Sequence, residues 1–321
     1  MGARGSERRM PPSRGLRLLR AVGSALGAIV GFVTALVVVT TAEGVLARAR
    51  LLPTRDESLP VRTGRFGDDE RPPIAFGMMG DSLAVGYGSE DPDSTPGVLL
   101  AKGLVEASGR SVVLTNVADI GAESVALVPQ LAKLRTAGVP DVVVIVIGAN
   151  DVMHLKRLTD ALWSLSAVVG KLRHDGTRVV VATCPDLGTI HPFTQPLRFF
   201  AHWYSRVLAT GQAIVVLRAG GRSVSLADTL GPLFRREPED MFSAHDRLHP
   251  SDLGYAAAAA VILPSLRVAA GYPLPVDVHL PHRVYRKGSH HPLAWWAFRA
   301  SRRVGSRLAA DAGDERPVPD R

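Results

Sequence analysis

The chain has 321 residues, of which 46% are hydrophobic and 21% charged, and its formal net charge is +8. This composition is typical of a globular protein with a sizeable core and excludes a wholly disordered chain. The positive charge does not indicate a nucleic-acid partner, because the excess arginine and lysine is concentrated near the two chain ends, beside apolar segments. Basic clusters at such positions fit an anionic membrane surface better.

An uncharged apolar segment, residues 21–42, follows a basic stretch, residues 1–20, that carries six arginines before the apolar run. Twenty-two helical residues span roughly 33 Å, about the thickness of the hydrocarbon core of a bilayer. The positive-inside rule then places residues 1–20 in the cytoplasm and the rest of the chain outside. We expect a single-pass transmembrane signal anchor. The alternative is a cleaved signal peptide and a secreted protein, because Thr40-Thr41-Ala42 and Ala47-Arg48-Ala49 offer small-residue cleavage sites.

Residues 43–73 are rich in proline and charged residues and lack periodicity, which predicts a linker. From Ile74 onward, short apolar runs alternate with longer helical patterns. Strands are predicted at 74–79, 111–117, 141–147, 178–183 and 223–227, and helices at 96–108, 125–137, 155–174, 197–219 and 251–270. Strands that are apolar throughout and separated by helices indicate a parallel sheet covered on both faces. We therefore predict a three-layer α/β/α sandwich with a five-stranded parallel sheet in residues 74–272, whose ligands bind at the carboxyl ends of the strands.

The first polar signature, Gly80-Asp81-Ser82-Leu83, directly follows the first predicted strand. A serine hydroxyl becomes a nucleophile when a base removes its proton, and a strand-to-helix turn exposes it beside a backbone N–H that can stabilise an oxyanion. Alone, the tripeptide Gly-Asp-Ser is a weak signal, since such tripeptides also occur as turns and helix caps.

Two further signatures follow the second and third strands. Gly148-Ala149-Asn150-Asp151 places an amide side chain that can donate to an oxyanion, although an ordinary turn with Asp151 as a helix cap explains it equally well. The segment from Asn116 to Gly121 offers an unobstructed N–H at Gly121 to the same pocket.

The last signature, Asp246-Arg247-Leu248-His249-Pro250, lies just before the final helix. A histidine base needs a carboxylate to fix its tautomer, and a separation of three residues allows the pairing of Asp246 with His249 within one turn. His245 is a neighbouring alternative, but Asp246 is poorly spaced to orient it.

In this order the four signatures resemble those of the SGNH/GDSL hydrolase superfamily, from about Ile74 to Ala270, and the chain looks most like exported or membrane-anchored GDSL-type esterases of actinobacteria. The resemblance implies a flavodoxin-like fold with Ser82 as nucleophile, His249 as general base and Asp246 as its orienting acid. It also implies an oxyanion hole made by the Ser82 and Gly121 N–H groups and the Asn150 side chain. The chain differs from the family pattern at Asp119, an acidic residue between Asn116 and Gly121. It also extends some fifty residues past the C-terminal end of the family core.

Other candidate residues carry weaker signals. The remaining histidines lack metal-ligand spacing, so we expect neither a metal nor a cofactor. Cys184, the only cysteine, excludes an intrachain disulfide and reads as a buried structural thiol. The aromatic side chains either wall an acyl pocket or belong to the core; they are Phe193, Phe199, Phe200, Trp203 and Tyr204.

The C-terminal extension, residues 273–321, is basic, and residues 292–308 place apolar side chains on one helical face with arginines around it. Such a helix either lies in a membrane interface or packs on the domain.

The sequence thus predicts an extracytoplasmic serine esterase acting on small acyl esters, with a short acyl chain and a lipid or an acylated sugar as the carrier. An acyltransferase, a thioesterase, a lysophospholipase and a non-catalytic module that binds envelope glycan or lipid are the alternatives.

Overall fold

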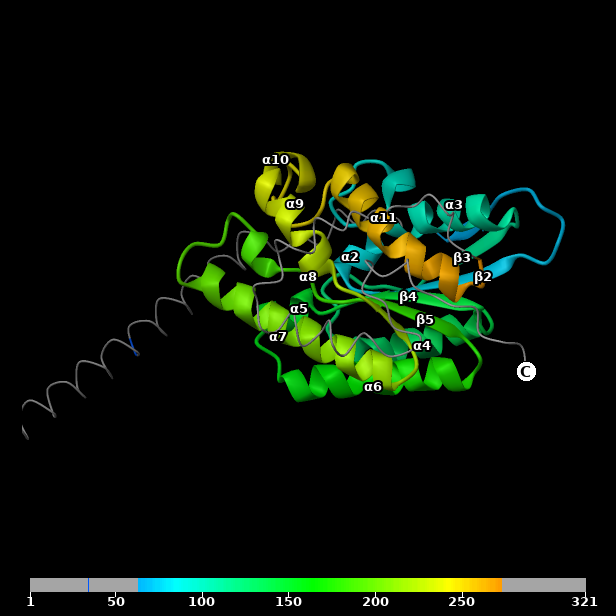
Figure 1. Ribbon diagram of the computed structural model, residues 1–321, viewed down its shortest axis with the longest axis horizontal. Helices are drawn as coiled ribbons and strands as arrows, with labels where there is room; N and C mark the ends of the chain where they lie inside the picture. Colours follow the sequence, from blue (N-terminus) through cyan, green and yellow to red (C-terminus); the bar gives the residue numbers. More distant parts are fainter. Residues whose placement is uncertain (1–33, 35–62, 273–321) are drawn as a thin grey trace, which may run out of the picture.

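A computed structural model of the protein describes residues 63–272 and Thr34, and residues 63–272 form a single sheet with helices on both faces (Figure 1). The sheet has six strands in the order β1-β3-β2-β4-β5-β6. They are β1 (Gly64–Phe66), β2 (Ile74–Gly80), β3 (Val112–Asn116), β4 (Val142–Val146), β5 (Arg178–Ala182) and β6 (Arg222–Val224). The neighbouring pairs from β3 to β6 are parallel, as predicted.

The predicted strand number was wrong, because the sheet contains β1 in addition to the five expected strands. β1 pairs antiparallel with β3 at the edge of the sheet, with Gly64 opposite Leu114. It lies inside the range predicted as a linker, residues 43–73. Three residues, only partly buried or exposed, are too few to show a strand periodicity, so the sequence pattern gave no sign of it.

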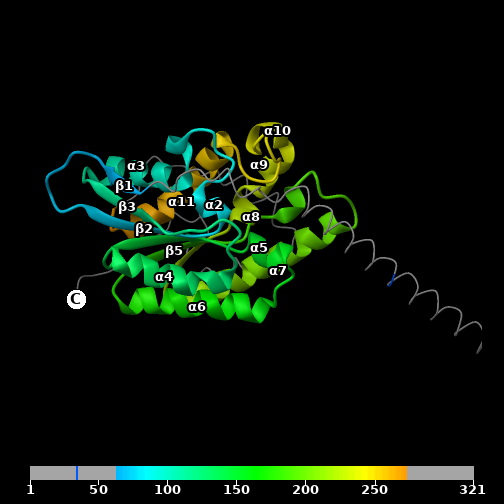
Figure 2. The same ribbon diagram turned by 180° about the vertical axis from the view of Figure 1, so that it is seen from behind.

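The helices form the two outer layers (Figures 1 and 2). On one face lie α2 (Ser82–Val85), α3 (Pro96–Ser108), α8 (Leu226–Thr229) and α11 (Asp252–Ala269), and on the other α4 (Leu127–Thr136), α6 (Leu158–His174) and α7 (Leu197–Arg218). The short helices α5 (Ala149–Met153), α9 (Gly231–Arg236) and α10 (Pro238–Met241), and the 3-10 turns η1 (Pro92–Ser94), η2 (Ser124–Ala126) and η3 (Leu187–Thr189), belong to the connections.

The sheet lies between two hydrophobic clusters, and the residues of β4 alternate between them. Its five residues are all buried, with Val142, Val144 and Val146 in the cluster beneath α3 and α11. Val143 and Ile145 point to the opposite cluster, beneath α4 and α6. Alternation along a strand thus supplies both cores, as expected for a sheet buried on both faces.

Within the described part of the chain, α11 alone is long and apolar enough to cross a bilayer by length and composition. Its residues Tyr255, Ile262 and Leu266 are buried in the domain. The predicted transmembrane helix at 21–42 and the amphipathic segment at 292–308 lie outside the described residues, apart from Thr34.

Candidate active site

Ser82 lies at the carboxyl end of β2, where the chain turns sharply into α2. The turn depends on Gly80, whose φ is +137° and where a Cβ atom would fall 1.8 Å from the carbonyl oxygen of Val146. No side chain fits at such a distance, so only glycine allows the turn. Asp81 then caps α2 by accepting a hydrogen bond from the N–H of Leu83. Ser82 is therefore the first residue of a short helix and is 6% exposed.

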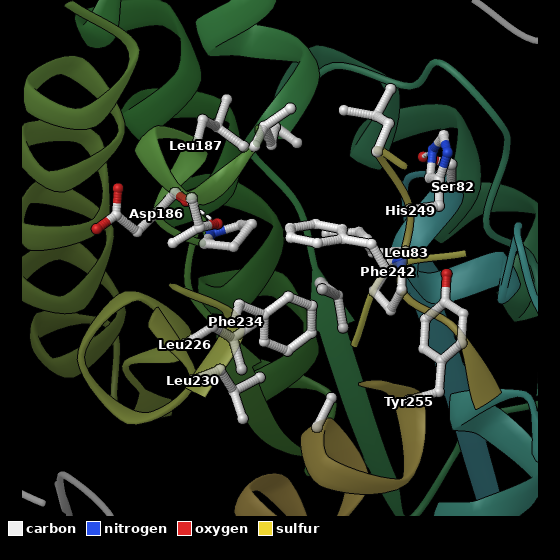
Figure 3. Close-up of a pocket in the computed structure, with 18 of the residues that line it drawn as sticks. Ser82, Leu83, Asp186, Leu187, Leu226, Leu230, Phe234, Phe242, His249 and Tyr255 are labelled. Atoms are coloured by element: carbon white, nitrogen blue, oxygen red, sulfur yellow. Dashed lines mark hydrogen bonds between the residues drawn. The ribbon is translucent and has the colours of Figure 1, made fainter. Parts of the chain in front are cut away.

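His249 lies beside Ser82 although the two residues are distant in sequence (Figure 3). Its Nε2 is 2.9 Å from Ser82 Oγ, and its Nδ1 is 2.5 Å from Asp246 Oδ2. An ionised carboxylate only accepts, so Nδ1 carries the ring proton and Nε2 is left to accept from the Ser82 hydroxyl. The ring of Tyr87 packs edge-on against His249 with 4.7 Å between centroids and restricts its movement.

The loop before α11 holds Asp246 in place through backbone donors. Asp246 Oδ1 accepts from the N–H of Leu248 at 2.9 Å and of His249 at 3.0 Å. Burial acts to raise the pKa of Asp246, but the hydrogen bonds and charge of His249, together with these two N–H groups, lower that pKa below its ordinary value. Asp246 is therefore ionised at neutral pH.

The two other predicted oxyanion donors face the same cavity as Ser82, since Gly121 and Asn150 both line it. The loop that carries Gly121 is tied to α5, because Asn150 Nδ2 donates to the carbonyl of Ala122 at 3.0 Å. Asp151 strengthens the tie by accepting from the Ser124 N–H and, at 2.8 Å, from its hydroxyl. The exposed Asp119 is not among the cavity-lining residues.

A second carboxyl group, Asp81, is fully buried next to the serine. Burial raises its pKa to about 7, with a further contribution from the negative charge of Asp151. The backbone N–H groups of Leu83, Gly148 and Ala149 oppose this rise. Asp81 therefore titrates close to neutral pH in the folded protein.

The cavity beside Ser82 has a volume of about 300 Å³. Apolar side chains form most of its wall, and α8, α9, the segment before α11 and α11 itself supply many of them. The wall residues that the sequence analysis missed are Leu226, Leu230, Phe234, Phe242 and Ile262. The first four come from short helices and loops, which carry no periodic pattern, whereas Ile262 lies in the long helix α11 and resembles a core residue in sequence.

The aromatic residues proposed as an acyl pocket do not line this cavity. Phe193 is buried in the core, and Tyr204 packs against it. Phe199, Phe200 and Trp203 are exposed on α7 at 54%, 43% and 38%. These five residues therefore do not form an acyl pocket. The alternative, that they belong to the core, holds for Phe193 and Tyr204 and not for the three exposed residues.

The remaining candidates lie apart from the serine. Cys184 is buried outside the cavity wall, and burial raises the pKa of its thiol well above the ordinary value. His245 is exposed and does not line the cavity. Among residues 63–272, no group of three or more His, Cys, Asp or Glu side chains is arranged to hold a metal ion.

Comparison with known proteins relates the chain to one family. The model of the GDSL-like lipase/acylhydrolase family matches residues 78–257. A GDSL-like esterase of Mycobacterium tuberculosis is 39% identical over 245 residues, which cover 75% of this chain and 78% of that protein.

The chain also matches solved structures at low sequence identity, and TesA shows the same fold. TesA is 19% identical with a TM-score of 0.50, and the match covers 61% of this chain and 99% of TesA. A catalytic mutant of the acetylxylan esterase Axe2 from Geobacillus stearothermophilus is 16% identical with a TM-score of 0.49, covering 62% of this chain and 94% of Axe2.

Proposed function

Because the chain belongs to the GDSL-like lipase/acylhydrolase family and is a GDSL-type carboxylic ester hydrolase, we propose that Ser82, His249 and Asp246 carry out its reaction. The observation that supports this most directly is the continuous chain of contacts from Ser82 Oγ through the His249 ring to Asp246. A base within hydrogen-bond reach of a serine, itself oriented by a carboxylate, is the arrangement that activates a hydroxyl nucleophile.

In the first step Ser82 Oγ attacks the carbonyl carbon of the ester, and its proton passes to His249 Nε2. The carbonyl oxygen gains the negative charge, which the N–H groups of Ser82 and Gly121 and the amide of Asn150 stabilise. The tetrahedral intermediate collapses when the C–O bond to the alcohol breaks. His249 returns the proton to the leaving alcohol, and the acyl group stays on Ser82.

In the second step a water molecule takes the place of the alcohol. His249 accepts a proton from the water, whose oxygen attacks the acyl carbon, and a second tetrahedral intermediate releases the carboxylic acid. The proton returns to Ser82 Oγ. The ionised Asp246 stabilises the imidazolium form of His249 in both steps. An alcohol in place of this water would give an acyltransferase, and a thioester substrate a thioesterase, with the same residues.

We place this activity outside the cytoplasmic membrane. The support is sequence-based: the uncharged segment 21–42 and the arginines before it. Protease treatment of intact cells is expected to degrade the catalytic domain, whereas cytoplasmic marker proteins survive. Protection of the domain in intact cells would contradict the assignment.

The proposed roles are tested with Ser82→Ala in the full chain. Hydrolysis of p-nitrophenyl butyrate is expected to fall by about a thousandfold or more in kcat/KM. Ser94→Ala is the matched control, because Ser94 lies in η1, outside the cavity wall, and bonds only locally to Asp91. Hydrolysis that survives in Ser82→Ala contradicts the role of Ser82. Absence of any ester hydrolysis in the folded wild-type chain favours a binding module instead.

A further inference from the structure

The cavity beside Ser82 is mostly apolar, and the hydroxyls of Thr189 and Tyr255, which also line it, already donate to the backbone carbonyls of Asp186 and Tyr87. Ser82, His249 and Asn150 supply polar atoms where the ester carbonyl would lie. Leu226, Leu230 and Phe234 stand across the cavity from Ser82 and His249 (Figure 3). The carboxylate of Asp186, at the same far side, points away from the cavity (Figure 3). The region beyond the nucleophile is therefore an apolar chamber.

The chamber wall is built from aliphatic and aromatic side chains of several elements. Phe234 of α9 and Phe242, which precedes the histidine loop, pack edge to face with 4.9 Å between ring centroids. Ile262 of α11 is 1% exposed and is part of the hydrophobic core. Leu230 joins α8 to α9 and is 7% exposed. The chamber is thus continuous with the core of the domain.

An ion-pair cluster fixes this wall. Asp186, with a fully buried carboxylate, contacts Arg235 of α9 at 2.7 Å and Arg206 of α7 at 3.6 Å. Arg206 also pairs with Asp228 of α8. The two short helices that line the chamber are therefore held to α7 and to the segment that joins β5 to η3. A wall held in this way limits the size of the group that enters.

An apolar chamber discriminates between substrate classes. A sugar hydroxyl buried there would lose its hydrogen bonds to water without finding partners, at a cost of about 1–3 kcal/mol for each group. An acetyl group would leave most of the 300 Å³ unfilled. A longer hydrocarbon chain instead gains free energy with each methylene that it buries.

We propose that this chamber binds the acyl chain of the substrate, that medium-chain acyl esters are preferred, and that Leu230 and Phe234 set the upper limit on chain length. The proposal rests on Ser82 being the nucleophile. It replaces the short acyl chain expected from sequence with a longer one. The acyl part is assigned to the chamber because it stays on Ser82 through both steps, whereas the alcohol must leave and water must enter between them.

The test compares p-nitrophenyl esters from acetate to decanoate on the full chain. Each buried methylene is expected to raise kcat/KM by about three- to fourfold until the chamber is filled, after which the rate levels or falls. A second series, from methyl to octyl acetate, is expected to show no such rise, because it varies the alcohol. A maximum at acetate in the first series, or a rise confined to the second, overturns the proposal.

Two variants locate the chamber. Leu230→Trp is expected to lower kcat/KM for octanoate at least tenfold more than kcat/KM for acetate. Leu253→Trp is the matched control, because Leu253 is 60% exposed on α11 and does not line the cavity. Phe234→Ala enlarges the chamber and is expected to shift the preferred ester to a longer chain. Equal losses on all esters in Leu230→Trp, together with no shift in Phe234→Ala, overturn the assignment.

Labelling of Ser82 by a small fluorophosphonate distinguishes a failure of the chamber assignment from a failure of the proposed function. If the wild-type chain is labelled and hydrolyses acetate through Ser82 but shows no preference for longer chains, the chamber assignment fails and the proposed function stands. If the chain is neither labelled nor active on any ester, the proposed function fails, and the chamber assignment fails with it.

Discussion

The side-chain amide of Gln130 exchanges two hydrogen bonds with the backbone of Gly80. Gln130 Oε1 accepts from the Gly80 N–H at 2.9 Å, and Gln130 Nε2 donates to the Gly80 carbonyl at 2.8 Å. Gln212 of α7 makes a similar pair of bonds just beyond the ends of β4 and β5. Its Oε1 accepts from the Cys184 N–H, and its Nε2 donates to the Ile147 carbonyl. Two buried glutamines thus pair backbone groups where the chain leaves the sheet, next to the site.

Gln130→Leu is expected to destabilise the protein by about 1–3 kcal/mol, because it leaves the buried Gly80 N–H without its acceptor, whereas the Gly80 carbonyl still accepts from the Asp119 N–H. Gly80 is two residues before Ser82, so kcat is expected to fall as well. Urea unfolding and ester hydrolysis measure the two effects. Lys133→Leu, on the exposed side of the same helix, is the control and is expected to change neither. An unchanged unfolding midpoint in Gln130→Leu would show that the pairing contributes nothing.

Asp81→Asn is expected to change the pH dependence of stability. The pKa of Asp81 is raised from 3.8 to about 7 in the folded protein, chiefly by burial. The neutral acid is favoured in the fold, so its contribution is fully present below pH 3.8 and is lost as the pH rises through 7. Asparagine stays neutral and still caps α2. The Tm of the variant minus that of the wild type should therefore increase between about pH 4 and 7. A constant difference across this range argues that Asp81 does not titrate there.

The sequence predicted the parallel part of the sheet because its strands are buried on both faces. The run from Asp141 to Ile147 has no polar residue after its first, and its residues Val142–Val146 form β4, in which every residue is buried. The edge strand β1 and the helices α8 to α10 escaped prediction, because each has only three to six residues. At that length neither a strand nor a helix period can be recognised.

The positions of Ser82, Asp246 and His249 could be named because each follows a strand or precedes the last helix, where parallel topology gathers residues at one end of the sheet. The chamber wall could not be found in this way. Leu230 and Phe234 resemble core residues in sequence, and only the tertiary packing of α9 against η3 and of α8 against α11 shows that their side chains border a cavity.

Asp186→Asn is expected to destabilise the protein at neutral pH by about 3–5 kcal/mol, because it removes a fully buried carboxylate that pairs with Arg235, His202 and Arg206 at once. Burial acts to raise the pKa of Asp186, but His202 and Arg235 hold it below its ordinary value. The stabilisation is therefore present above pH 3.8 and is lost as the pH falls through the lowered pKa. The difference between variant and wild type should shrink in acid.

The comparison variant for Asp186 is Arg235→Met. Arg235 is 41% exposed, so its ion pair is screened by solvent and its loss should cost no more than about 1 kcal/mol. Chemical unfolding between pH 3 and 7 checks both variants. Equal losses of unfolding free energy in the two variants would contradict the larger contribution assigned to the buried carboxylate of Asp186.

Asn150→Ala tests the oxyanion role against a positioning role. If the amide stabilises the developing negative charge, kcat falls by about a hundred- to a thousandfold while KM changes little. The same substitution also removes the bond to the Ala122 carbonyl, which ties the Gly121 loop to α5. Ser124→Ala loosens that tie from the other side, since it deletes the hydroxyl bond to Asp151 and touches none of the three proposed donors. It is expected to lower kcat by less than tenfold. Comparable losses in the two variants would assign Asn150 to holding the loop.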